Sequence, residues 1–226
     1  MKIAVLGTGM VGRALAERVA GLGHDVAVGT RDPQATLART EGDQGGIPPF
    51  SIWQGDHPDV ALLRFADAAA QAELVVNATS GGSSLEVLQL AGAENLAGKI
   101  LIDVANPLDF SRGFPPTLSV KDTDSLAEQI QRAFPEAKVV KTLNTLNATL
   151  MAEPAKLADA DHSIFVSGDD ADAKATVTEL LGSFGWQDII DLGDLSTARG
   201  TEMLLPIWLR LMNVLGTPTF NFKIVR

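Results

Sequence analysis

Residues 3–12 read Ile-Ala-Val-Leu-Gly-Thr-Gly-Met-Val-Gly, and this stretch decides how the rest of the chain is interpreted. Its first four residues, Ile3–Leu6, form a short apolar run of the kind that makes a buried strand. Apolar side chains then recur at helical spacing from Val11 to Leu22. The glycines between the strand and the helix fit the pattern G-x-G-x-x-G, which is informative only when it stands in this context.

Each glycine of this turn has a physical reason to be glycine. Gly7 permits a tight turn, Gly9 lets the backbone approach a diphosphate, and Gly12 lets the helix pack closely on the strand. The start of the helix supplies unpaired N–H groups and a positive dipole end, so we expect a diphosphate there. Thr8 and Met10 would contribute mainly backbone. The alternative is a plain glycine turn in another α/β fold, which explains the register of strand, turn and helix less well.

Short apolar runs alternate with helical patterns along most of the chain, as in strands that are connected by crossover helices. The sequence predicts an α/β fold: a Rossmann-type, doubly wound, mostly parallel sheet with a small α/β carboxyl-terminal extension. The polar stretch 40–50 is the expected long surface loop. The expected strands are Ile3–Leu6, Val26–Val28, Ala61–Leu63, Leu74–Val76, Ile100–Ile102, Val139–Val140, Ile164–Val166 and Ile189–Ile190. The expected helices are Val11–Leu22, Ala66–Ala72, Asp124–Phe134, Asp172–Phe184 and an apolar helix from about Thr201.

The second strand leads into Thr30-Arg31-Asp32-Pro33, at the position where dinucleotide-binding folds distinguish NAD from NADP. Thr30 offers a hydroxyl, and Arg31 offers a guanidinium that can bind a 2′-phosphate bidentately. Asp32 is either an acidic ligand of the ribose or, before Pro33, a helix N-cap, and the N-cap explains it better. We therefore predict NADP(H) as the cofactor; the alternative is that Arg31 is only a solvated surface residue.

Small and polar residues follow the later strands at the edge of the sheet where ligands bind. Ordinary loop, N-cap and turn chemistry would also explain them. The further cofactor contacts that we expect are Asn77, Ala78, Thr79, Ser80, Asn106 and Pro107.

Three residues of the last third are candidate substrate contacts: Asn144, Arg199 and Met203. Arg199 either binds an acidic group of a second ligand or pairs with Asp194 or Glu202. The helix that carries Met203 is apolar nearly all round, which favours burial in the core or in a dimer interface.

We expect an NADP-binding domain at 1–142, with a substrate or dimerisation region, 143–226, packed on it.

Composition excludes several classes of function. The net charge of −10, without a basic cluster, disfavours a nucleic-acid partner. The absence of cysteine excludes thiolate zinc sites, iron–sulfur clusters and cysteine nucleophiles, and the scattered His24, His57 and His162 show no metal-ligand spacing. The longest apolar stretch, Met203–Leu215, is too short to span a bilayer, and we expect no signal peptide before the first strand. We expect a cytoplasmic protein without a membrane or metal partner.

Few side chains can donate a proton to a reacting carbonyl. The chain has no tyrosine, and the three histidines fall at expected surface positions rather than at strand ends. Lys141, near the end of its strand, is the one candidate acid, although it alternatively faces solvent or a neighbouring carboxylate. These features favour hydride transfer between two cofactor-like rings, for which the protein supplies position and electrostatics.

The chain resembles the NADP oxidoreductases that use coenzyme F420, an 8-hydroxy-5-deazaflavin. The likeness is carried by Ile3–Gly12, Gly23–Arg31, Asn106–Leu108 and Gly193–Leu195 with the later apolar helix. It implies NADP contacts at Thr8, Gly9, Met10, Val11, Thr30, Arg31 and Asn77–Ser80. It also implies a deazaflavin stacked on the nicotinamide near Asn106, Asn144 and the final helix. Leu143-Asn144-Thr145 stands where we would expect Ile-His-Thr in archaeal members. The NADPH-binding part of membrane ferric reductases, where a flavin takes the hydride, is similar too.

The sequence thus predicts an NADPH-dependent oxidoreductase, expected to be a homodimer, that exchanges hydride with a flavin or deazaflavin. The first alternative is an NADPH-dependent reductase of a small carbonyl or imine, with Lys141 or an ordered water as the proton donor. The second is a non-catalytic NADP(H)-binding regulatory protein, which would need no cleft for a second ligand.

Overall fold

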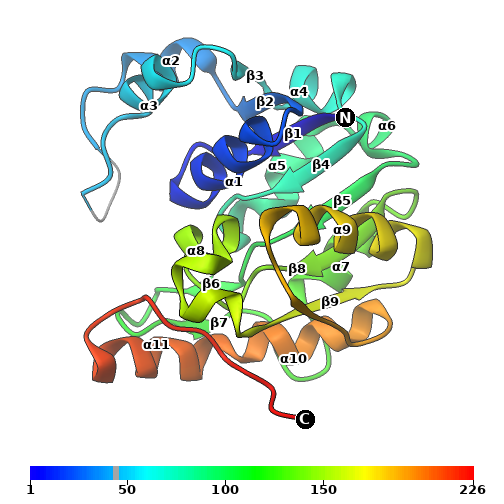
Figure 1. Cartoon of the computed structure of the whole chain (residues 1–226). Helices are drawn as coiled ribbons and strands as arrows, with labels where there is room; N and C mark the ends of the chain where they lie inside the picture. The colour runs from blue at the N-terminus through cyan, green and yellow to red at the C-terminus, as the bar shows by residue number, and fades with distance from the viewer. Residues whose placement is uncertain (43–45) are drawn as a thin grey trace.

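The computed structural model describes residues 1–42 and 46–226 and is built around one eight-stranded sheet (Figure 1). The strand order is β10-β9-β8-β5-β4-β1-β2-β3, and every neighbouring pair is parallel except β8 and β9. The mostly parallel sheet expected from the sequence is therefore confirmed. The strands of this sheet are β1 (Lys2–Leu6), β2 (Asp25–Thr30), β3 (Ala61–Arg64), β4 (Leu74–Asn77), β5 (Ile100–Asp103), β8 (Lys138–Thr142), β9 (Ser163–Gly168) and β10 (Asp188–Asp191).

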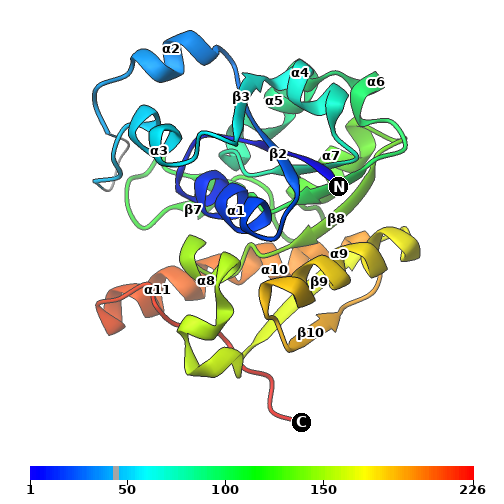
Figure 2. The ribbon, with the colours of Figure 1, turned by 45° about the horizontal axis from the view of Figure 1, so that its top comes forward.

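Helices cover both faces of the sheet, because the central strands bury side chains on each side. Ile3 and Val5 of β1 pack into one apolar cluster, while Ala4 and Leu6 pack into the other. Helices α1, α8 and α9 cover the first face, and α4, α5, α6 and α7 cover the second (Figures 1 and 2). The helices are α1 (Met10–Gly21), α2 (Pro33–Ala38), α3 (Phe50–Asp56), α4 (Phe65–Gln71), α5 (Ser84–Ala91), α6 (Ala93–Leu96), α7 (Leu126–Ala133), α8 (Ala148–Ala152), α9 (Ala171–Phe184), α10 (Ala198–Met203) and α11 (Leu205–Leu215).

Short elements complete the connections between these helices and strands. A two-stranded antiparallel ribbon lies between β5 and α7, and 3-10 turns occur at four places among the described residues. The expected loop at 40–50 ends where α3 begins at Phe50, and its residues 43–45 lie outside the described part of the chain. These short elements are β6 (Leu108–Asp109), β7 (Thr117–Leu118), η1 (Gly81–Ser83), η2 (Pro154–Lys156), η3 (Ala158–Ala160) and η4 (Leu195–Thr197).

The region after β8 extends the sheet and then adds two helices. β9 runs antiparallel to β8, and α9 leads to β10, which pairs with β9 in the parallel sense. Helices α10 and α11 then run along one side of the molecule (Figure 1). The expected apolar helix is split in two, because Pro206 stands in the first turn of α11. Within the described ranges no helix has the length and apolarity to cross a bilayer.

His162 is buried, so its expected surface position was wrong. The ring is 3% exposed and lies edge-on to Trp186, with centroids 4.9 Å apart. Asn221 Nδ2 lies 2.8 Å from Nδ1, and Nε2 lies 3.0 Å from the carbonyl oxygen of Pro154. Since the amide donates to Nδ1, Nε2 carries the proton and donates to Pro154. The tail that holds Asn221 lies far along the chain, which is why spacing alone placed this histidine wrongly.

Candidate cofactor-binding site

The candidate site lies at the carboxyl end of the sheet, where the strand order changes direction. β1 lies between β2 and β4, with Leu6 in register with both Gly29 and Asn77. The chain therefore leaves β1 between two strands whose connections turn to opposite faces. Such a switch point is where open α/β sheets bind their ligands.

The glycine turn is built by close contacts between backbone segments. Gly7 has φ +123°, and a Cβ added to it would lie 2.6 Å from the carbonyl oxygen of Ala78. A Cβ on Gly12 would lie 2.1 Å from the carbonyl oxygen of Gly7. A Cβ on Gly9, by contrast, would meet nothing within 4 Å. Gly7 and Gly12 are thus required by packing within the protein, whereas the space beside Gly9 is left free for something else.

The space beside Gly9 adjoins the amino terminus of α1. Gly9 is the N-cap of this helix and carries no side chain to cap it, and the first turn contains no acidic residue. The N–H groups of this turn and the positive dipole end therefore remain available to an anion. Together with the open space at Gly9, this arrangement fits a dinucleotide diphosphate.

Arg13, which sequence reasoning missed, braces the turn from behind. Its guanidinium donates to the carbonyl oxygens of Thr8, at 2.8 Å, and Pro48, at 2.6 Å. It also lies 5.4 Å above the centre of the Phe50 ring. An arginine on the inner face of an amphipathic helix is a signal that could have been found. Its contacts with Pro48 and Phe50, which lie 35 or more residues away, could not be predicted from the sequence.

The tip of β2 differs in part from expectation. Thr30 is buried, and its hydroxyl lies 2.8 Å from the hydroxyl of Thr36, so its side chain supports the turn rather than presenting itself to a phosphate. Asp32 is the N-cap of α2, as predicted, and accepts from the N–H of Ala35 at 3.1 Å. Arg31 remains exposed at the tip, and its side chain is free to meet a 2′-phosphate once it leaves its present partner, Glu86.

Asn77 is a structural residue, which corrects the expected ribose contact from its side chain. It is fully buried and donates to Asp103 at 2.8 Å and to Ser84 at 3.0 Å. Its amide oxygen accepts from the hydroxyl of Thr79 at 2.6 Å. Each polar atom of the Asn77 side chain is therefore used within the loop, which leaves the exposed Ser80 as the better placed polar side chain there.

The loops after β5 and β8 meet through a pair of asparagines. Asn144 donates to Asn106 Oδ1 at 2.9 Å, and Asn106 donates to the carbonyl oxygen of Asn144 at 2.9 Å. Asn144 also donates to the carbonyl oxygen of Thr201 at 3.1 Å, which ties both loops to α10. Gly81 packs on the same loop, since a Cβ there would lie 2.0 Å from the carbonyl oxygen of Asn106. The two asparagines predicted near the nicotinamide are thus brought together.

A pocket of about 540 Å³ opens beside the glycine turn and reaches α11. None of the described residues that line it has a titratable side chain. Among the predicted contacts it includes Met10, Val11, Ala78, Thr79, Ser80 and Asn106. The remaining walls are formed by Gly81, Val104, Ala105, Leu108, Phe110, Leu146, Asn147, Ala148, Met151, Trp208, Met212 and Pro218.

Lys141 is the centre of a buried ion cluster, which overturns its candidacy as a catalytic acid. Its Nζ lies 2.8 Å from Asp103 and 2.9 Å from Glu202, and all three side chains are at most 1% exposed. It also donates to the carbonyl oxygen of Ala105. Burial acts to lower the pKa of Lys141, but the two carboxylates outweigh it and raise that pKa above its usual value. A lysine so enclosed does not reach a ligand.

Arg199, Met203 and Pro107 are also among the predicted contacts that do not line the pocket. Arg199 pairs with Glu128, at 2.8 Å from Nε and 2.5 Å from Nη2, and not with either carboxylate proposed from the sequence. This pairing lowers the pKa of Glu128. Met203 is exposed on α10, and Pro107 is buried with its carbonyl oxygen bonded to the N–H of Ser119 at 2.8 Å. Spacing along the chain indicates none of these partners.

Two glycine variants separate packing from cofactor binding. Gly9→Ala should leave stability unchanged but weaken NADPH binding about tenfold or more, the equivalent of roughly 1.5 kcal/mol or more lost from contacts to a charged group. Gly12→Ala, by contrast, should lower the free energy of unfolding by about 1–3 kcal/mol, because the new methyl group collides with the backbone. Urea denaturation measures the free energy of unfolding of each variant, and a fluorescence titration measures its affinity for NADPH. Normal NADPH affinity in Gly9→Ala would contradict the placement of the diphosphate.

Removing the lysine of the buried cluster should cost stability rather than chemistry. Lys141→Met leaves Asp103 and Glu202 buried without their counterion, so we expect a loss of about 3–5 kcal/mol in the free energy of unfolding. Lys156→Met, which removes an exposed partner of Glu153, should cost at most about 1 kcal/mol. Urea titrations of both variants provide the comparison, and equal losses would show that the cluster is not the constraint described here.

Comparison with known proteins shows the family of the chain. The family described as "NADP oxidoreductase coenzyme F420-dependent" matches residues 2–107. A crystal structure of a candidate F420-dependent NADP reductase from Arthrobacter sp. FB24 is 66% identical, with a TM-score of 0.96 over 100% of both chains. The F420-dependent NADP reductase of Methanocaldococcus jannaschii is 29% identical over 93% of this chain and 92% of its own length.

A metalloreductase is also similar, over part of its length. STEAP3 of Rattus norvegicus is 32% identical over 92% of this chain, but the chain spans only 38% of that relative. The expected resemblance, the Rossmann-type fold and the oxidoreductase class are confirmed by these findings. The chain therefore belongs to the family of coenzyme F420-dependent NADP oxidoreductases.

Proposed function

We propose that this chain transfers hydride between NADP(H) and a deazaflavin-type ring that stacks on the nicotinamide. One observation carries the proposal: a pocket of about 540 Å³ adjoins the glycine turn and has no titratable side chain among the described residues that line it. Its volume falls within the range of roughly 300–1,000 Å³ that is common for small-molecule sites. Transfer of hydride from one ring carbon to another needs no general acid at the reacting atoms, so such a lining suits it.

The residues of the turn and of the strand tips would hold NADP(H). The N–H groups at the start of α1, beside Gly9, would bind the diphosphate, and Arg31 would bind the 2′-phosphate. The nicotinamide would then extend into the pocket beside Met10 and Asn106. When bound, it supplies the two-electron hydride chemistry, while the protein sets the approach of the two rings.

The walls of the pocket suit a flat apolar acceptor. Met10 and Phe110 stand at its mouth with more than half of their surface exposed, while Trp208 closes it from α11 with 8% exposed. Sulfur and aromatic groups make favourable contacts with ring systems. Asn144 stands where the archaeal pattern led us to expect histidine, but it is buried behind Asn106 and acts through that residue.

The two alternatives are supported less well. Reduction of a small carbonyl or imine needs a proton donor, and Lys141, the residue proposed for it, is enclosed by carboxylates; only an ordered water remains for that role. A regulatory NADP(H)-binding protein would need no second cleft, whereas here a pocket adjoins the glycine turn at the end where we propose that the nicotinamide binds. A cytoplasmic location stays a prediction.

The acceptor can be identified by mixing the protein with NADPH or NADH and a panel of acceptors under anaerobic conditions. We expect rapid loss of the deazaflavin absorbance with NADPH, slower reaction with NADH, and weak or no turnover of FMN, FAD, quinones or small carbonyls. Faster turnover of a carbonyl than of the deazaflavin would refute the proposed acceptor. Equal use of NADH and NADPH would refute the cofactor preference.

We also propose that the chain forms a homodimer through the outer face of α10 and α11. Met203, Ile207 and Val214 recur there at helical spacing and are 38%, 48% and 83% exposed. Contiguous apolar side chains on a helix face are typical of an interface. These residues point away from the pocket wall, to which α11 contributes Trp208 and Met212.

Light scattering tests this interface. The double variant Ile207→Glu, Val214→Glu should be monomeric and still bind NADPH, whereas wild type should be dimeric at micromolar concentration. Leu90→Glu, which alters an exposed leucine on α5, should leave the dimer intact. A monomeric wild type, or a double variant that remains dimeric, would contradict the interface.

A further inference from the structure

The guanidinium that is placed to bind the 2′-phosphate already has an anionic partner. Arg31 Nη2 lies 2.6 Å from Glu86 Oε1, and the two side chains are 66% and 62% exposed. The pair joins residues 55 positions apart, so it does not result from local helix geometry. Both side chains face solvent, which means that the contact can open without disturbing the core.

The ion pair connects the two flanks of the glycine turn. Arg31 follows the tip of β2, while Glu86 stands in the first turn of α5, after β4 and its loop. β2 and β4 are the two neighbours of β1, so their tips lie on either side of the turn that leads to α1. A contact between Arg31 and Glu86 therefore runs across the adenosine end of the proposed cofactor site.

We propose that Glu86 is a specificity-determining residue, whose carboxylate competes with the 2′-phosphate of NADP(H) for Arg31. The inference rests on the proposed binding of NADP(H). A phosphate carries more charge than a carboxylate and can accept from two guanidinium nitrogens, so it displaces Glu86 from Arg31. NADH has no group that can do this. With NADH bound, Arg31 therefore stays on Glu86.

The competition lowers NADPH affinity in two ways. The ion pair must open before the phosphate binds, and the released carboxylate then lies near a like charge. Each contribution is small, because the groups are exposed and screened by solvent. An exposed ion pair changes an equilibrium constant by no more than about fivefold, which sets the scale of the expected effect. Such tuning would favour release of the nucleotide after hydride transfer.

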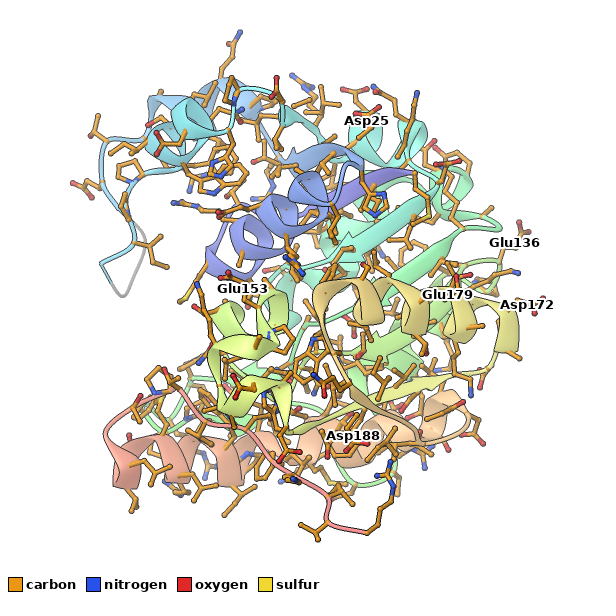
Figure 3. The ribbon with its side chains drawn as sticks, in the orientation of Figure 1. Asp25, Glu136, Glu153, Asp172, Glu179 and Asp188 are labelled. Atoms are coloured by element: carbon orange, nitrogen blue, oxygen red, sulfur yellow. The ribbon has the colours of Figure 1, made fainter. Side chains whose placement is uncertain are left out.

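A double-mutant cycle tests the competition by nucleotide binding rather than turnover. Dissociation constants for NADPH and NADH are measured by fluorescence titration in wild type, Glu86→Gln, Arg31→Ala and the double variant. Glutamine retains the shape and the helix propensity of Glu86 but removes its charge. Glu179→Gln, on the exposed side of α9 (Figure 3), is the control for a general change in net charge.

We expect Glu86→Gln to bind NADPH about two- to fivefold more tightly than wild type, with NADH affinity unchanged. The gain should be smaller in the Arg31→Ala background, where only the repulsion between the carboxylate and the phosphate remains, and it should shrink as salt is added. Glu179→Gln should bind both nucleotides like wild type. The thermal unfolding midpoint of Glu86→Gln should match that of wild type, which confirms that the fold is intact.

Three results would overturn the inference: unchanged or weaker NADPH binding in Glu86→Gln, an equal gain for NADH, or a gain that is equally large without Arg31. Failure of the proposed function would look different. In that case wild type itself would show no preference for NADPH over NADH, or would bind neither. If wild type prefers NADPH and the effects of the two substitutions are additive, only the proposed role of Glu86 is refuted.

Discussion

The close approach of backbone segments where β1 becomes α1 is the constraint on which the site depends. Gly12 packs against the carbonyl oxygen of Gly7, and Gly7 packs against the loop that follows β4 at Ala78. These contacts leave no room for side chains, so the start of α1 is held against the sheet with its N–H groups facing outward. The open space beside Gly9 results from this arrangement, and it is there that an anion can reach the helix terminus.

A second set of constraints fixes the other wall of the pocket. Lys141 is the shared counterion of Asp103 and Glu202 inside the protein, while Glu202 also accepts from the N–H groups of Leu126 and Ala127 at the start of α7. The cluster thus joins β5, β8, α7 and α10. Removing one of these side chains leaves buried charge unpaired, so the stability of the cluster depends on all three residues. The carboxyl-terminal helices are thereby tied to the nucleotide-binding half, and the pocket between them keeps its shape.

The sequence predicts well what depends on local pattern. Strands of continuous apolar residues, the glycine turn and the N-cap at Asp32 follow from spacing and from elementary sterics, and the structure has them where expected. Long-range pairing was not predictable. A polar residue at a strand end, such as Asn77, can face a ligand or a neighbouring loop, and only the fold shows that its side chain faces Asp103. The same holds for the partners of Lys141 and of Arg199, which lie 36 or more residues away along the chain.

The central claim is that the dinucleotide lies across the start of α1, with its extra phosphate on Arg31 and its reactive ring in the pocket beside Asn106. A crystal structure with NADP⁺ bound tests this most directly. The account predicts diphosphate oxygens within hydrogen-bond distance of the N–H groups that follow Gly9, and a guanidinium turned from Glu86 to the phosphate. A nucleotide bound elsewhere, or bound here with Arg31 still paired to Glu86, would contradict it.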